Sequence, residues 1–131
     1  MTWNHLVQQV REYGRYDSGR EAERVLEAVL ATFGGQLVGE ERCDLAAALP
    51  DRAREILVAQ IPHIEPLDAP ALVAAIATTL NTTTASARWD TSSVLAVLAD
   101  HVGTPLTDRL IAQLPAGYAL LFGRASLATA A

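Results

Sequence analysis

The sequence predicts an all-α fold of seven to eight helices, arranged as two tandem pseudo-repeats of about four helices each. Apolar residues recur at helical spacing through almost the whole chain, and alanine is abundant while runs of β-branched residues are rare. The chain also resembles itself at an offset of 65 residues, and it offers no convincing strand. With 131 residues, half of them apolar, it can bury a sizeable core.

The clearest predicted helix follows Ser18. From Ala22 to Phe33 the apolar residues are spaced i, i+3, i+4, i+7, i+8 and i+11, which places them in one stripe on a helix surface. Ser18 and Glu21 have the spacing of a capping box, which marks the start of a helix. The pair 34–35, both glycines, is a suitable end because glycine accepts the left-handed conformation.

The other predicted helices begin and end at residues that favour helix termini. Pro50 suits a first turn, where its missing N–H is not needed, and Asp68 is a suitable N-cap. Pro62 and Pro66 prevent the helix before them from continuing. These helices are predicted over residues 2–13, 40–48, 50–60, 69–80, 86–101, 105–113 and 115–123.

The internal repeat aligns cap positions as well as core positions. Residues 49–50 and 114–115 are both Leu-Pro, and each of the pairs 39–40 and 104–105 offers an N-cap followed by a suitable first helical residue. A unit of about 60 residues is marginal alone, so we expect the two copies to share one core. We divide this single domain into repeat one at about 2–60, a linker at 61–67, repeat two at about 68–123 and a frayed tail at 124–131.

One family resemblance follows from these features. A leading amphipathic helix, an Ala-x-x-x-x-x-x-Val-Leu segment and a Leu-Pro before a short helix occur twice. The two repeats are most evident over residues 21–57 and over 87–102 with 110–122. This pattern resembles an uncharacterised bacterial family, catalogued as domain of unknown function 2267. The resemblance implies an all-helical fold and a bacterial source. It implies no activity, because the family has no established catalytic residues.

Composition argues against several classes of function. The formal net charge is −5, all ten basic residues are arginines, and both halves of the chain are acidic. We therefore expect no nucleic-acid binding and no binding to anionic membranes, which need a basic surface. No apolar run approaches the ~20 residues that span a bilayer, and no signal peptide is visible. With Cys43 as the single cysteine, a cytoplasmic location is expected.

We predict no catalytic residue, no cofactor and no metal site. None of the three histidines has another at i+3 or i+4. His101 is interpreted as a residue near a helix C-terminus, where its protonated form would favour the helix dipole. Cys43 lies near a helix start, and we interpret it as a small, partly buried residue rather than a reactive thiolate.

Four large aromatic side chains at helix ends are the candidate contacts with a partner or ligand, because such residues dominate binding hot spots. The alternative is that they only plug the ends of the helical bundle. These residues are Trp3, Tyr13, Tyr16 and Trp89.

The expected function is that of a non-catalytic helical binding or interaction protein, with an accessory or stress-associated role. A groove between the two repeats is the expected site. The partner would be an unknown protein or a small apolar ligand. Two alternatives stay open: a small enzyme that uses residues converging from different helices, and an apolar small-molecule-binding protein. The sequence does not indicate the oligomeric state.

Overall fold

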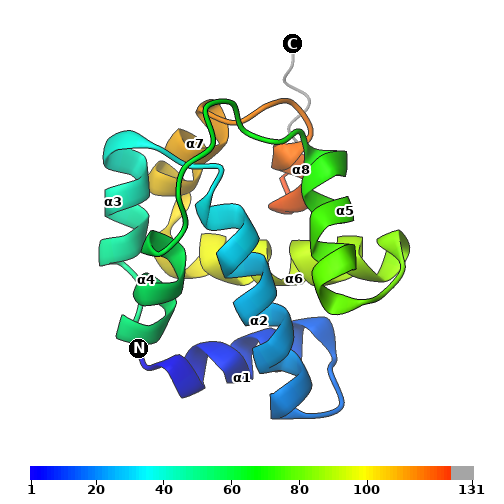
Figure 1. Cartoon of the computed structure of the whole chain (residues 1–131). Coiled ribbons are helices and arrows are strands. Elements are labelled where there is room, and N and C mark those ends of the chain that lie inside the picture. The colour runs from blue at the N-terminus through cyan, green and yellow to red at the C-terminus, as the bar shows by residue number, and fades with distance from the viewer. Residues whose placement is uncertain (125–131) are drawn as a thin grey trace.

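The computed structural model describes residues 1–124, and in that range it contains eight α-helices and no strand (Figure 1). The predicted all-helical fold is confirmed. The predicted frayed tail, apart from its first residue, lies outside the described residues. The helices are α1 (Trp3–Gly14), α2 (Gly19–Gly34), α3 (Gly39–Ala47), α4 (Asp51–Val58), α5 (Ala69–Leu80), α6 (Thr84–Val102), α7 (Thr104–Ala112) and α8 (Tyr118–Leu121).

Four of these helices begin at a side-chain cap. Thr2, Ser18, Asp68 and Thr83 each accept a hydrogen bond from the backbone N–H three residues further on. Ser18 and Thr83 are 65 residues apart, and Thr2 and Asp68 are 66 residues apart. Ser18 and Thr83 therefore stand at positions that the 65-residue offset pairs, and Thr2 and Asp68 are paired once a one-residue gap is placed in a loop.

Two helix starts differ from the prediction by the same single residue. The expected N-caps Gly39 and Thr104 are the first residues of α3 and α7, and the caps are Val38 and Gly103, neither with a side-chain hydrogen bond. Gly103 has φ +92°, which favours glycine, so the chain turns there and not at Thr104. The tandem repeat stays a prediction, which this shared shift at equivalent positions supports.

Helix α8 is much shorter than the predicted helix over 115–123. Gly117 has φ +102°, in the left-handed region, so a helix cannot run through it from Pro115. Four residues of helix remain after that turn. In contrast, α6 begins at Thr84, two residues earlier than predicted, because the Thr83 hydroxyl caps its first turn.

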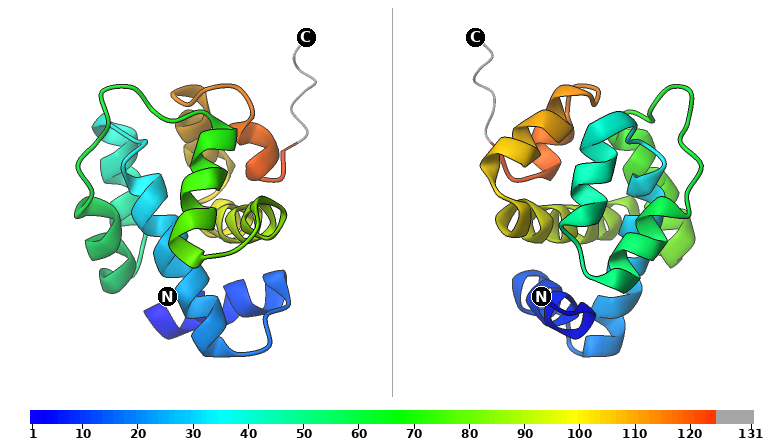
Figure 2. Two further views of the ribbon diagram at one scale, coloured as in Figure 1. Left: turned by 45° about the vertical axis from the view of Figure 1, so that its right-hand side comes forward. Right: turned by 90° about the vertical axis from the view of Figure 1, so that its left-hand side faces the viewer.

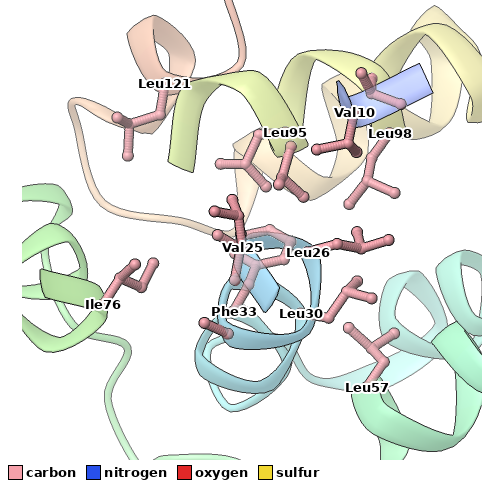
Figure 3. Close-up of a cluster of buried hydrophobic side chains, with 14 of the residues drawn as sticks. Val10, Val25, Leu26, Leu30, Phe33, Leu57, Ile76, Leu95, Leu98 and Leu121 are labelled. Atoms are coloured by element: carbon pink, nitrogen blue, oxygen red, sulfur yellow. The ribbon is translucent and has the colours of Figure 1, made fainter. Parts of the chain in front are cut away.

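One hydrophobic core joins the two halves of the chain. Leu30 and Leu95 are both fully buried and belong to the same cluster of packed side chains (Figure 3). Helix α2 lies in the middle of the fold and packs against α1, α4, α5 and α6 (Figure 1). The C-terminal end of α2 contributes Phe33, whose ring meets those of Tyr118 and Phe122. The expected common core is therefore present.

Several arginines bind main-chain carbonyl groups rather than carboxylates alone. Arg24 on α2 donates to the carbonyl of Leu80, the last residue of α5, at 3.1 Å. Arg54 on α4 donates to the carbonyls of Ala46 and Leu49, at the end of α3. Carbonyls at helix ends have fewer backbone donors than those inside a helix, so the guanidinium groups add hydrogen bonds there; the Ala46 carbonyl also accepts from the Leu49 N–H.

Candidate functional site

The predicted aromatic residues do not form a single site. Trp3 lies where α1 meets α2 and α4: its indole N–H donates to a Glu23 carboxylate oxygen at 2.6 Å, and the Arg52 guanidinium lies 5.2 Å from its ring centroid. Tyr13 is half exposed and lines shallow hollows beside Asp100. Both residues lie apart from the hollow that the other two aromatics line.

Tyr16 and Trp89 attach the loop after α1 to α6. The Tyr16 hydroxyl donates to Oδ1 of Asp90 at 2.5 Å, and the Trp89 indole N–H donates to the Gly14 carbonyl at 3.0 Å. Gly14 is needed here, because a Cβ atom would lie 2.2 Å from the Tyr16 ring. Trp89 still exposes half of its surface. Three of the four predicted residues thus have structural partners within the chain.

Burial controls the ionisation of the Tyr16–Asp90 pair. Burial raises the pKa of the Tyr16 hydroxyl above its usual range, and the hydrogen bond to Asp90 raises it further. Burial also raises the pKa of the Asp90 carboxyl, and the bond from Tyr16 opposes that effect only in part. Burial similarly raises the pKa of Tyr118, whose hydroxyl donates to the Leu67 carbonyl.

These shifts predict that stability falls at alkaline pH. A folded-state tyrosine pKa above the unfolded value gives stability that is complete below about pH 10 and is lost as the pH rises beyond it. Because the chain has no lysine, tyrosines dominate the titration in this range. Tyr16→Phe should remove about half of the slope of unfolding free energy against pH, measured by urea unfolding. Tyr13→Phe, at an exposed site, is the control that should leave the slope unchanged.

Within residues 1–124, a pocket with mainly apolar walls lies among α5, α6 and α8. This pocket, called here the α5–α6–α8 pocket, has a volume of about 620 Å³. Gly117 lets α8 approach α5 closely, since a Cβ there would lie 3.2 Å from that of Ala69. Its lining residues are Ala69, Pro70, Val73, Thr84, Ala85, Arg88, Gly117, Leu120 and Leu121.

The pocket is within the second half of the chain, so it is not the expected groove between the repeats. The predicted helix over 115–123 gives no indication of this pocket, because it runs through Gly117 and does not distinguish the two adjacent leucines. Leu121 is buried, whereas Leu120 exposes 60% of its surface. Two adjacent leucines on a single turn of helix are the signal that could have indicated an exposed apolar residue, because adjacent positions face different directions.

Arg88 is the one charged residue among those that line the pocket. It lies on the exposed side of the first turns of α6, and within residues 1–124 it makes no ion pair. Among the residues that the structure describes, the pocket therefore combines apolar walls with one positive charge that has no ion-pair partner.

A second hollow, of about 630 Å³, lies between the end of α3 and the start of α1, and its lining includes Arg52, Arg54 and His101. These groups already have partners. Arg52 pairs with Glu27, Arg54 pairs with Asp51, and the His101 ring lies 2.9 Å from the Ala48 carbonyl. The polar side chains that line this hollow are therefore already engaged in interactions that stabilise the fold.

The remaining candidate groups for chemistry are dispersed. Cys43 is exposed, not partly buried as predicted, because α3 turns Leu45 and Ala46 inward. Over residues 1–124, no three His, Cys, Asp or Glu side chains are close enough together to hold a metal ion. In the same part of the chain, none of the helices combines the length and the apolar character required to cross a bilayer.

Comparison with models of protein families gives a match over most of the chain. Residues 3–121 match the model of a family described as "Uncharacterized conserved protein (DUF2267)". No curated protein shows significant similarity to the chain. The matched range includes all eight helices of residues 1–124 and every residue of the shared core except Phe122. The chain therefore belongs to the DUF2267 family.

Proposed function

We propose that the protein is a non-catalytic binding module, and that the α5–α6–α8 pocket receives an apolar group attached to, or next to, an anionic group. One observation carries this proposal: the pocket has apolar walls and an arginine without an ion-pair partner in the described chain. Apolar walls with a few placed polar groups are typical of binding sites. A guanidinium group beside them favours carboxylates.

The same lining supports binding more than catalysis. The Arg88 guanidinium group offers N–H donors and no acceptor, which suits it to hold an anionic group and not to accept a proton. The other polar side chain in the lining is that of Thr84, at the start of α6. Such a site can hold and orient a ligand, whereas proton transfer would need a group that titrates near neutral pH.

A small probe can test this proposal. We expect 4-methylpentanoate, a branched aliphatic chain with a carboxylate, to shift the methyl NMR signals of Ala69, Ala85 and Leu120, with a Kd on the order of 1 mM. Its uncharged amide, 4-methylpentanamide, should bind several-fold more weakly. Arg88→Gln should remove the difference between the two probes.

The matched control is Arg20→Gln, which removes an exposed arginine from the first turn of α2. This residue is distant in sequence from all those that line the pocket. It should leave the preference for the carboxylate unchanged. The proposal is wrong if neither probe shifts the pocket methyl signals at tens of millimolar, or if the shifts cluster elsewhere. A carboxylate preference that survives in Arg88→Gln would show that Arg88 does not read the charge.

We also propose a cytoplasmic location in a bacterium, and a tandem repeat as the origin of the two halves. The single cysteine supports the first, and the equal offsets of caps and helix starts support the second. Fractionation of the native host would test the location. Superposition of α1–α4 on α5–α8 would test the repeat.

A further inference from the structure

The linker between α4 and α5 displays the most exposed large apolar side chains of the described chain. Ile61 exposes 87% of its surface, and Ile64 exposes all of it. The residue after Ile64 is Glu65, which is also exposed. An aliphatic side chain next to a carboxylate is the kind of group that the α5–α6–α8 pocket is proposed to receive.

This linker is held in a defined shape on both sides of Ile64. The His63 backbone N–H donates to the Gly35 carbonyl at 2.8 Å. The Leu67 N–H donates to the Gln36 side-chain carbonyl, and the Tyr118 hydroxyl donates to the Leu67 carbonyl, both at 2.7 Å. A segment that is ordered before it binds loses less conformational entropy on binding.

Gly35 allows the first of these attachments. A Cβ atom at position 35 would lie 2.9 Å from the His63 ring, so a larger residue would require the His63 side chain to move from its place against α2. With His63 and Leu67 both fixed, the residues between them, 64–66, are carried outward. Ile64 and Glu65 are therefore presented to solvent by the fold.

The linker and the pocket lie at the same end of α5. The chain arches from α4 over to the first residues of α5, which stand beside α8 (Figure 2). The first two residues of α5, Ala69 and Pro70, already line the pocket. Because the two surfaces are neighbours, a two-fold axis can bring the linker of each copy to the pocket of the other.

We propose that the occupant of the pocket is a second copy of this chain. Ile64 of one copy enters the apolar α5–α6–α8 pocket of the other, and Glu65 pairs with the Arg88 guanidinium at its rim. The inference rests on the proposed function and names its partner. Each contact occurs twice in a two-fold dimer, and the buried surface is small, so we expect a dissociation constant on the order of 100 μM.

A charge exchange tests the pairing. Sedimentation equilibrium of the full chain up to about 1 mM should show a monomer–dimer equilibrium. Glu65→Arg and Arg88→Glu should each weaken the dimer about tenfold or more, and the double variant should restore it to within about threefold of the original. Ile64→Ser should leave a monomer. All these positions are exposed, so circular dichroism should show unchanged helix content.

Val38→Ser is the matched control, because Val38 is a half-exposed aliphatic residue of the first half of the chain, and it should not change the dimer. A chain that stays monomeric at 1 mM overturns the inference, as does a dimer unaffected by Ile64→Ser or one that the double variant does not restore. Titrating Ile64→Ser with 4-methylpentanoate separates the two proposals. If the probe binds to that monomer, the proposed function holds whatever the result for the dimer. If the probe does not bind, the proposed function itself is wrong.

Discussion

Phe33→Ala is expected to lower the free energy of unfolding by about 3–5 kcal/mol, the usual cost of emptying a large core site. Phe33 is fully buried at the end of α2, the helix that packs against four others. Its ring centroid lies 5.8 Å from that of Phe122 in an edge-to-face arrangement, and 6.4 Å from that of Tyr118. Both partners come from the last part of the chain, so the cavity would open where the two halves meet.

Urea unfolding followed by circular dichroism measures this change through the transition midpoint. Phe33→Leu is the control, because it keeps an apolar side chain of moderate size and should cost about 1–1.5 kcal/mol. If the slope of unfolding free energy against urea concentration is unchanged, the lower midpoint reflects a loss of stability and not a looser native state. A cost below about 1 kcal/mol for Phe33→Ala would contradict a core shared between the halves at this residue.

The parts of this fold that the sequence predicts are those with local causes. The apolar stripe from Ala22 to Phe33 and the Ser18 cap locate α2 correctly, because spacing and capping act within one helix. Two of the errors occur where glycine conformation decides. Gly117 has φ +102° and delays the start of α8, and Gly103 has φ +92° and places the start of α7 at Thr104, one residue earlier than predicted.

The candidate site was predictable only in part, because it depends on pairings across many residues. The sequence indicates Trp89 as a candidate contact at a helix end, and the side chain is half exposed, but its bond to Gly14 joins residues 75 positions apart. The pocket itself needs Leu120 to point away from the core while Leu121 points into it. No local pattern specifies which of two adjacent leucines a distant helix will cover.

The positions of the arginines give a structural reason for the use of arginine in place of lysine. A guanidinium group offers five N–H donors in a planar fork, so one side chain can satisfy several carbonyls, whereas an ammonium group acts as a point charge. Arg11 bonds to two carbonyls in the loop after α1, and Arg24 bonds to the end of α5. The most extensive example is Arg42, on α3.

Arg42→Ala should lower the free energy of unfolding by about 2–3 kcal/mol, because it leaves the carbonyl ends of two helices without their donor. Its Nε donates to Gly34, at the end of α2, at 3.3 Å. Its Nη2 reaches the carbonyls of Leu57, Val58 and Gln60, at the end of α4, at 3.2, 3.4 and 2.7 Å. The expected cost is less than the sum of these bonds, because water can reach the exposed carbonyls in the variant.

Arg42→Lys distinguishes the contribution of the planar guanidinium group from that of the positive charge. Lysine keeps the positive charge near the two C-termini but cannot bond to both at once, so it should recover less than half of the lost stability. Arg20→Ala, at an exposed site on α2, should change stability by less than about 0.5 kcal/mol. Thermal and urea unfolding of the three variants measure these differences. Full recovery in Arg42→Lys would mean that the charge, and not the bridging of α2 to α4, stabilises this corner of the fold.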